Sequence, residues 1–508
     1  MKRASQTVLI LPGALADADL AEMPDDLSLQ IGQSDDATFD MLDDHIGSLH
    51  AAGQLVFSWG RTLTLLEGST DLVAQKAGGT DQFVAELKDG PVKAALKHVP
   101  PLRSLLRIGS GTVTNRDLTV TDDERKTLVR AHLITLKPDG RGMTVTIAAL
   151  QPLRGYEKAM RRLREHLEAT AASPSPRTAE LSSMLFPDYP RYSAKPDVAI
   201  LDNATAWQTA TDIITVYLQV ARENEAGVIA DRDTEFLHDY RVALRKVRSV
   251  LSLFKGVYPE EQTADFKRKA SELMSPTGRL RDLDVYLLAK EEYFAMVPSS
   301  LHEGLEQMFK MFRKERRRAH RAMAVHLDSA RYQAGIEALQ AEFLQKRGPG
   351  KGPRADAPVG DYARQLIWKR YRKVCRIARE ITADTPVEQV HELRIGCKKL
   401  RYLMEFFAPL YPAAAVKPIL KPLKRLQDNL GLFNDYSVQQ AFLKSFMDAH
   451  EPIGHRQDLA LAQSIGALIA VLHERQQEER ARIMASFDQF DGPDVRDQFR
   501  SLFNAKEA

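Results

Sequence analysis

Two patterns of hydrophobic residues divide this chain. Between residues 1 and 150, short apolar or alternating runs such as LSLQIG and MTVTIAAL are separated by Gly, Asp and Asn. Such runs are typical of β-strands. From about residue 200 to residue 504, apolar residues recur at steps of three and four, the period of amphipathic helices. The pattern predicts an α+β region followed by an all-α region.

Two breaks in these patterns suggest domain boundaries. The stretch 171–197 is rich in Pro and Ser, and the stretch 346–361 contains four Gly and three Pro within a helical region. Pro and Gly at this density interrupt regular structure. A chain of 508 residues is also too long for one ordinary core. The predicted organisation is an α+β domain at 1–170, a linker at 171–199 and an all-α domain at 200–504, whose halves run from about 200 to 345 and from 362 to 504.

The two helical halves are related in sequence. The string HDYRVALRKVR begins at His238, and HELRIGCKKLR begins 153 residues later at His391. The same offset relates further positions without a gap: Arg241 and Arg394, Arg245 and Lys398, Lys246 and Lys399, Arg248 and Arg401, Phe254 and Phe407, Tyr258-Pro259 and Tyr411-Pro412, Gly278 and Gly431, and Asp282 and Asp435. Agreement of this kind indicates a duplicated unit. We therefore predict two similar helical bundles related by a pseudo-twofold axis.

The repeated string places cations on one face of a helix. At about 100° per residue, four basic positions in each copy fall within a stripe about 80° wide. These positions are His238, Arg241, Arg245 and Arg248 in the first copy, and His391, Arg394, Lys398 and Arg401 in the second. Apolar residues occupy the opposite side, where they suit a bundle core. Each helix is therefore expected to present a rail of positive charge.

A rail of like charges needs compensation from outside its own helix. Like charges at i,i+4 repel by a few tenths of a kcal/mol, and Asp239 and Glu392 lie off the stripe. Acidic residues on neighbouring helices or an external polyanion are the two explanations. The duplication of the whole stripe, histidine included, favours the polyanion. Although the net charge is only +3, basic residues concentrate at 310–321, 368–379 and 417–427.

The residue types of the rail indicate the kind of polyanion. Arg makes bidentate contacts to phosphate, Lys supplies a mobile charge, and His adds a contact that weakens as pH rises. Recognition of bases would call for aromatic or amide side chains between these cations, and the stripe has no aromatic residue. Inorganic polyphosphate is therefore the favoured ligand. Binding to a nucleic-acid backbone is the alternative.

Other sequence features bear on location and cofactors. The two cysteines, Cys375 and Cys397, cannot form a disulfide framework or a zinc cluster, which fits a reducing compartment. No stretch approaches the roughly 20 apolar residues of a membrane span, and the apolar N-terminal run is read as a buried strand. We expect a cytoplasmic protein without a cofactor, a metal site or a membrane partner.

The helical region resembles the CHAD domain, a family named for conserved histidines in an α-helical domain. The family pattern is a histidine followed by LR, a base-rich run, and later an LG-x-x-RD or LG-x-x-ND segment. Here HDYRVALRKVR precedes TGRLRDLDV, and HELRIGCKKLRY precedes LQDNLGLFNDYSV. Only the residue before Gly278 departs from the LG pattern. The resemblance implies two four-helix bundles with pseudo-twofold symmetry, a central basic pore and binding of long-chain polyphosphate. It also implies residence on polyphosphate granules, with granule-associated proteins as further partners.

The resemblance also implies the ligand contacts. The predicted polyphosphate-binding residues are His238, Arg241, Arg245, Lys246, Arg248, His391, Arg394, Lys398, Lys399 and Arg401, with Lys421 and Lys424 as additions from the helix before the LG segment. Asp282 and Asp435 are interpreted as helix-capping or arginine-orienting residues. None of these residues is predicted to be catalytic.

Residues 1–170 resemble the CYTH domain, a mostly antiparallel β-tunnel that hydrolyses triphosphates with a metal. The strings GRTLTLLEG and LQPLRGYEKAMRRL carry this resemblance. The catalytic Glu-x-Glu-x-Lys signature is missing, because the corresponding strand has Ser28, Gln30 and Gly32, which cannot replace two carboxylates around a hard cation. Only Arg61 stands near the strand that usually carries paired arginines. We predict a degenerate, non-catalytic domain that serves as a scaffold or docking surface. A metal-dependent triphosphatase or polyphosphatase and an unrelated α+β domain are the alternatives.

Overall fold

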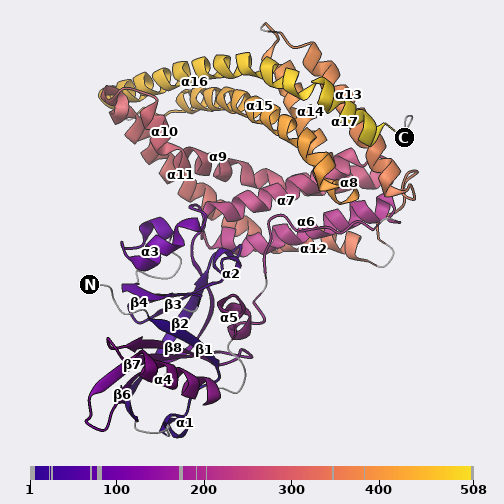
Figure 1. Ribbon diagram of the computed structural model, residues 1–508. Coiled ribbons are helices and arrows are strands. Elements are labelled where there is room, and N and C mark those ends of the chain that lie inside the picture. Colours follow the sequence, from indigo (N-terminus) through magenta and orange to yellow (C-terminus); the bar gives the residue numbers. More distant parts are fainter. Residues whose placement is uncertain are drawn as a thin grey trace. The chain divides into compact units, whose positions relative to one another are not determined.

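The computed structural model describes most of the chain and divides it into two compact units. The described residues are 6–21, 23, 27–68, 71–76, 83–170, 176–189, 191–201, 203–345, 348–382, 384–452 and 454–504. The first unit is Met1–Ala194 and the second is Lys195–Ala508. Figure 1 shows the sheet of the first unit and the helices of the second, and the two are described separately below. The prediction of an antiparallel β region followed by an all-α region is confirmed.

The first unit is built on one antiparallel sheet of eight strands in the order β1-β8-β7-β6-β2-β3-β4-β5. The strands are β1 Thr7–Pro12, β2 Ser28–Asp43, β3 Gln54–Trp59, β4 Thr62–Glu67, β5 Asp71–Lys76, β6 Leu106–Thr121, β7 Thr127–Pro138 and β8 Val145–Pro152. The long strands β2 and β6 pair from Ser28 opposite Thr121 to Asp43 opposite Leu106. The sheet curves far enough for its edge strands β1 and β5 to contact each other.

Helices cover both faces of this sheet because its strands alternate buried side chains. Leu163 and Leu167 of α4 (Glu157–Thr170) join one core. Leu181 and Leu185 of α5 (Thr178–Leu185) join the other. Shorter helices are α1 Asp17–Ala21, α2 Ser48–Ala51 and α3 Pro91–Ala95. The position of α5 differs from the sequence-based expectation of a linker at 171–199, since its leucines are fully buried in the core of the first unit.

The second unit consists of helices joined by short connections. They are α6 Ala206–Ile229, α7 Thr234–Leu253, α8 Glu260–Met274, α9 Gly278–Leu288, α10 Lys290–Ala295, α11 His302–Asp328, α12 Ala330–Leu344, α13 Val359–Arg379, α14 Val387–Phe406, α15 Ala413–Asp448, α16 His455–Phe490 and α17 Pro493–Phe503. The described part of the predicted break at 346–361 is irregular up to Pro358, and α13 begins one residue later. Within the described residues, no helix has both the length and the apolar character needed to cross a membrane.

The sequence duplication is also a duplication of structure. Helices α6, α7, α8 and α11 begin 153 residues before α13, α14, α15 and α16 respectively. In the first copy α6, α7, α8 and α12 pack in a ring of four, and in the second copy α13, α14, α15 and α17 make the same set of contacts. Two four-helix bundles related by the predicted offset are therefore present.

The two copies differ where long helices continue or break. In the first copy a 3₁₀ turn at Ser275–Thr277, which contains Pro276, separates α8 from α9. In the second copy α15 runs through the equivalent positions, and α16 likewise continues where Ser329 separates α11 from α12. The long arms of α15 and α16 lie side by side (Figure 1) and share a core with α9 and α11.

A stacked aromatic pair marks the centre of the pseudo-symmetry. Phe254 and Phe407 are equivalent positions in the two copies, and their rings stack with centroids 4.9 Å apart and an interplanar angle of 15°. A contact between equivalent residues is what a twofold axis produces. Around this axis α7 packs against α14, so the two repeated strings are brought together.

Candidate functional site

The apolar face of each repeated helix directs its cations to the other side. In α7 the side chains of Leu244, Val247 and Leu251 are buried in the bundle. Asp233 caps this helix, since its Oδ1 accepts hydrogen bonds from the backbone N–H groups of Glu235 and Phe236. The start and the rotation of α7 are therefore fixed locally, and the cationic stripe is left to face the neighbouring helices α9 and α14.

In the first copy, three guanidinium groups surround one carboxylate. Burial lowers the pKa of Arg241; Asp282 opposes this effect, and the nearby charges of Arg245 and Arg281 add to it. Arg241 also donates a hydrogen bond to Oγ1 of Thr277. Burial raises the pKa of Asp282, while Arg241, Arg279 and Arg281 lower it. Two further carboxylates lie near these arginines, since Glu315 pairs with Arg279 and Asp284 is close enough for Arg281 to lower its pKa.

The second copy repeats the arginine–aspartate pair, whereas the positions equivalent to Arg279 and Arg281 are Leu432 and Asn434. Nη2 of Arg394 lies 4.0 Å from Oδ1 of Asp435, and Nδ1 of His391 lies 2.6 Å from Oδ1 of Asn434. Burial lowers the pKa of Lys398 to about 8, and the charges of Arg245, Arg394 and Arg401 contribute in the same direction, whereas Asp435 opposes them. Burial has removed much of the water around this ammonium group, and the nearby carboxylate of Asp435 does not fully offset that loss.

The two cationic stripes meet at Arg245 and Lys398, which are equivalent positions of the repeat. The ammonium of Lys398 also lies 5.8 Å from the ring centre of Tyr402. The structure therefore joins residues from both copies into one group, called here the central cluster: Arg241, Arg245, Arg281, Arg394 and Lys398. Sequence reasoning missed Arg281, although it stands in the TGRLRD string beside Asp282.

Two guanidinium N–H groups of the central cluster are buried without a hydrogen-bond partner among the described residues. They are Nε of Arg245 and Nη1 of Arg281. A buried charged donor that lacks a partner costs on the order of 1–3 kcal/mol or more. A phosphate oxygen that reached either group would supply the missing acceptor. This is the clearest structural indication of a ligand.

Lys246 and Lys399 point away from the central cluster. Each follows a stripe residue by one position, a rotation of about 100° around the helix. Lys246 is only 8% exposed, and its Nζ donates a hydrogen bond of 2.7 Å to Oη of Tyr217 on α6. Lys399 faces Arg370 and Lys373 of α13, because these charges contribute to the lowering of its pKa.

The remaining predicted contacts lie at the ends of the cationic stripes. His238 and Arg248 are half-buried on α7. Arg401 pairs with Glu405 at 2.6 Å, so the expectation that the helix itself provides little compensation is wrong at this position. Lys421 and Lys424 are exposed on α15, and neither makes an ion pair within the described residues.

The two aspartates orient arginines and do not cap helices. Asp282 is the fifth residue of α9, immediately after its first turn, and Asp435 lies deep inside α15. Each acts on the arginine of its own copy, Asp282 on Arg241 and Asp435 on Arg394. Of the two roles considered from the sequence, the structure supports orientation of the arginines.

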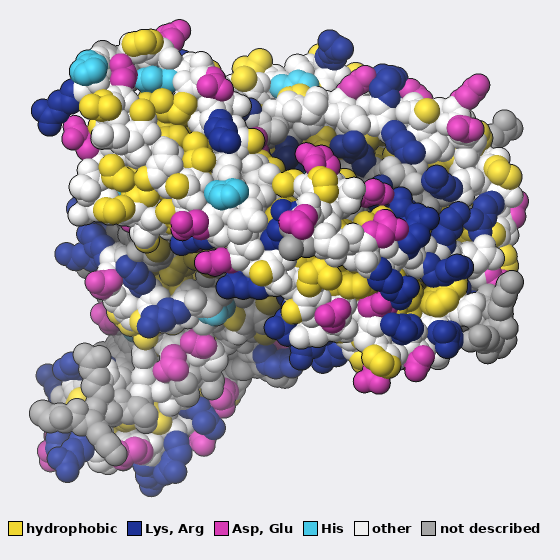
Figure 2. Space-filling model, turned by 90° about the horizontal axis from the view of Figure 1, so that it is seen from above, with side chains coloured by type: hydrophobic (Ala, Val, Ile, Leu, Met, Phe, Trp, Pro, Cys, Tyr) yellow, Lys and Arg dark blue, Asp and Glu magenta, His cyan; other side chains and the backbone are white. Residues whose placement is uncertain are grey.

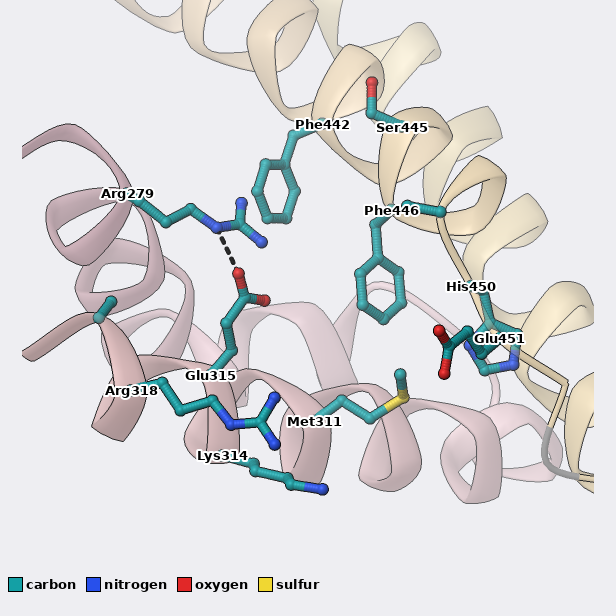
Figure 3. Close-up of a pocket in the computed structure, with 12 residues that line it drawn as sticks. Arg279, Met311, Lys314, Glu315, Arg318, Phe442, Ser445, Phe446, His450 and Glu451 are labelled. Carbon is teal, nitrogen blue, oxygen red and sulfur yellow. Dashed lines mark hydrogen bonds and ion pairs between the residues drawn. The ribbon is translucent and has the colours of Figure 1, made fainter. Parts of the chain in front are cut away.

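A cavity of about 940 Å³ lies between α9 and α11 on one side and the end of α15 on the other. Figure 3 shows Arg279 beneath Phe442, with Glu315 directed toward it. Nε of Arg279 lies 2.6 Å from Oε1 of Glu315, and its guanidinium carbon lies 4.8 Å from the ring centre of Phe442. Lys314 and Arg318 add positive charge to the wall. Because Arg279 also acts on Asp282, this cavity adjoins the first-copy half of the central cluster.

The fold and the central cluster define a duplicated helical-bundle protein with a cationic centre. Residues 212–444 match the family model of the CHAD domain, and every predicted contact lies within that range. The helical unit of this chain is therefore similar to the CHAD domain over these residues.

Two solved structures are similar to the chain. The first, "Crystal structure of the CHAD domain from the plant Ricinus communis", is 24% identical, with a TM-score of 0.45, and the match covers 61% of this chain and 96% of that one. The second, "PptA from Streptomyces chartreusis", is 14% identical, with a TM-score of 0.40, and the match covers 56% of this chain and 98% of that one. No curated protein matches the chain.

Proposed function

We propose that this protein binds inorganic polyphosphate at the central cluster. The observation that carries the proposal is the pair of buried guanidinium N–H groups without a partner among the described residues, Nε of Arg245 and Nη1 of Arg281. Phosphate oxygens accept bidentate hydrogen bonds from arginine, and a chain of phosphates presents them at every unit. The similarity of residues 212–444 to the CHAD domain supports this ligand class.

The surroundings of the cluster favour phosphate over nucleic-acid bases. Tyr240 and Tyr402, the aromatic residues of the repeated strings, are 0% and 9% exposed. A buried ring offers no face on which a base can stack. The contacts that the cluster can offer are therefore charge-assisted hydrogen bonds to anionic oxygens.

The role proposed for the protein is binding without catalysis, in the cytoplasm and at polyphosphate granules. In the N-terminal unit Ser28, Gln30 and Gly32 lie on β2, the strand compared with the catalytic strand of CYTH domains. Their side chains provide no carboxylate at those positions. We propose that this unit is a CYTH-like scaffold.

Charge reversal tests the proposal directly. The double substitution Arg241→Glu, Arg394→Glu is expected to abolish binding of long-chain polyphosphate to the full-length protein, measured by isothermal titration calorimetry. Arg161→Glu, at an exposed arginine of α4, is the control for a change of charge outside the site. Far-ultraviolet circular dichroism verifies that each variant is folded.

Unchanged affinity in the folded double variant would refute the central cluster as the binding site. Competition identifies the ligand class, because all phosphate polymers bind through counterion release and share a dependence on salt. RNA that displaces polyphosphate at equal phosphate concentration would show that the site is not selective for polyphosphate. Release of phosphate from tripolyphosphate in the presence of Mg²⁺ would contradict a purely binding role.

A further inference from the structure

A second group of cations lies on α13, outside the central cluster. Lys369, Arg370, Lys373 and Arg376 fall within an arc of about 120° around this helix. They line a cavity of about 540 Å³ together with Lys255 and Arg354, and these six residues define what is called here the α13 cavity. Figure 2 shows lysine and arginine side chains gathered on the right of the view, the side on which α13 lies in Figure 1.

Three separate segments of the chain build this cavity. Lys255 follows the end of α7, and Arg354 belongs to the irregular segment before α13. Hydrogen bonds of 2.8 Å from the backbone N–H of Arg354 to the carbonyl of Gly256, and from Gly352 to Val257, hold this segment against the turn after α7. The guanidinium of Arg354 is fixed over the ring of Tyr362 at 4.5 Å and donates to Gln365 at 2.6 Å. The cations therefore converge on a fixed framework.

The α13 cavity contains more positive than negative charge. Nζ of Lys373 lies 3.2 Å from Oε1 of Glu392. Within the described residues, none of the other five cations of the cavity makes an ion pair. Lys399 adds a further cation at the edge, where burial and the charges of Arg370, Lys373 and Lys255 lower its pKa. Arg354 and Arg370 are half-buried and the other four cations are exposed. Like charges that converge in this way repel each other, and an anion bound among them relieves the repulsion.

The first copy of the repeat shows that the bundle does not need these cations. The residues of α6 equivalent to Lys369, Arg370, Lys373 and Arg376 are Val216, Tyr217, Val220 and Glu223. At the same place in the fold, Lys246 of the first copy donates a hydrogen bond to Tyr217, whereas Lys399 of the second copy faces Arg370. The first copy therefore has a lysine hydrogen-bonded to a neutral tyrosine, where the second copy has a lysine next to an arginine.

We propose that the α13 cavity is a second anion site, which takes a compound carrying several phosphate groups. Its volume lies within the range of about 300–1,000 Å³ that is usual for small-molecule sites. Six converging cations suit a ligand with a charge of several units, such as inorganic triphosphate. The phosphates could belong to a free oligophosphate or to the end of a polyphosphate chain held at the central cluster, and the experiment separates these sources.

The repeat itself supplies the test variant. Lys369→Val, Arg370→Tyr and Lys373→Val together give α13 the residues of α6 and restore a lysine–tyrosine pair at Lys399. The parent is the full-length protein with Arg241→Glu and Arg394→Glu, so that the central cluster does not contribute. We expect inorganic triphosphate to bind this parent, measured by titration calorimetry, and to bind the α13 variant at least roughly tenfold more weakly because charge-assisted contacts are lost.

The remaining arm distinguishes the two phosphate sources. The three α13 substitutions are also placed in the wild-type background and titrated with long-chain polyphosphate. Weakened binding identifies chain ends as occupants, and unchanged binding identifies free oligophosphate. Absence of triphosphate binding to the parent, or equal binding by the parent and its folded α13 variant, would overturn the proposal. Because the parent and its α13 variant carry the same two charge reversals in the central cluster, the comparison between them is independent of whether that cluster binds polyphosphate.

Discussion

The lowered pKa of Lys398 leads to a quantitative prediction of how polyphosphate binding depends on pH. In the free protein, burial and the charges of Arg245, Arg394 and Arg401 lower its pKa from 10.5 to about 8. A polyanion bound at the central cluster offsets these charges, so the pKa of Lys398 is higher in the complex than in the free protein. Binding is then coupled to proton uptake by this lysine above pH 8.

The sign and the size of the effect follow from linkage. A group whose pKa is raised by the ligand strengthens binding fully below its free pKa, and this contribution is lost as pH rises toward its bound pKa. If the bound pKa returns to its usual value, affinity falls about twofold at pH 8, about tenfold at pH 9 and close to a hundredfold at pH 10. Histidine side chains are ordinarily neutral throughout this range and add little to the slope.

The assay is titration of long-chain polyphosphate at constant ionic strength between pH 7 and pH 10. Long chains are required because their terminal phosphates, which also titrate, are then a negligible fraction of the ligand. Lys398→Arg is the matched control, since an arginine keeps its charge over this range. We expect the decrease above pH 8 in the wild type and a nearly flat profile in the variant. Equal slopes for the two proteins would refute the assignment of the titrating group to Lys398.

Two further substitutions test features that the structure places around the cluster. Arg281→Leu removes a buried N–H that has no partner among the described residues. It is expected to weaken polyphosphate binding roughly tenfold and to raise the melting temperature of the free protein. A lower melting temperature with unchanged affinity would contradict this account. Phe254→Ala is expected to cost about 3–5 kcal/mol of unfolding free energy in urea titrations, since a fully packed ring at the pseudo-twofold axis is lost, and a cost under about 1 kcal/mol would show that the Phe254–Phe407 stack does not hold the bundles together.

The sequence was sufficient to predict the repeat and its geometry, because a duplication preserves spacing. The offset between His238 and His391 also relates the first residues of α7 and α14. The stripe positions Arg241, Arg245, Arg394 and Lys398 follow from helical periodicity alone, and the structure brings these four together.

Other parts of the site depend on tertiary contacts that no periodicity reveals. Lys246 and Lys399 occupy equivalent positions, yet one reaches a tyrosine and the other faces an arginine. The burial of Arg281 could not be predicted from the sequence either, since it depends on how α9 lies against α7. The pairing of Arg401 with Glu405, in contrast, could have been predicted from their i,i+4 spacing.

The stack of Phe254 on Phe407 marks a pseudo-twofold axis, and this symmetry bears on which kind of polymer suits the site. A nucleic-acid strand has a direction, so its contacts with two halves related by a twofold axis cannot be equivalent. A linear polyphosphate is the same from either end, so it presents the same phosphate oxygens to both halves of the site. The duplicated architecture around these two rings therefore matches a polymer without polarity.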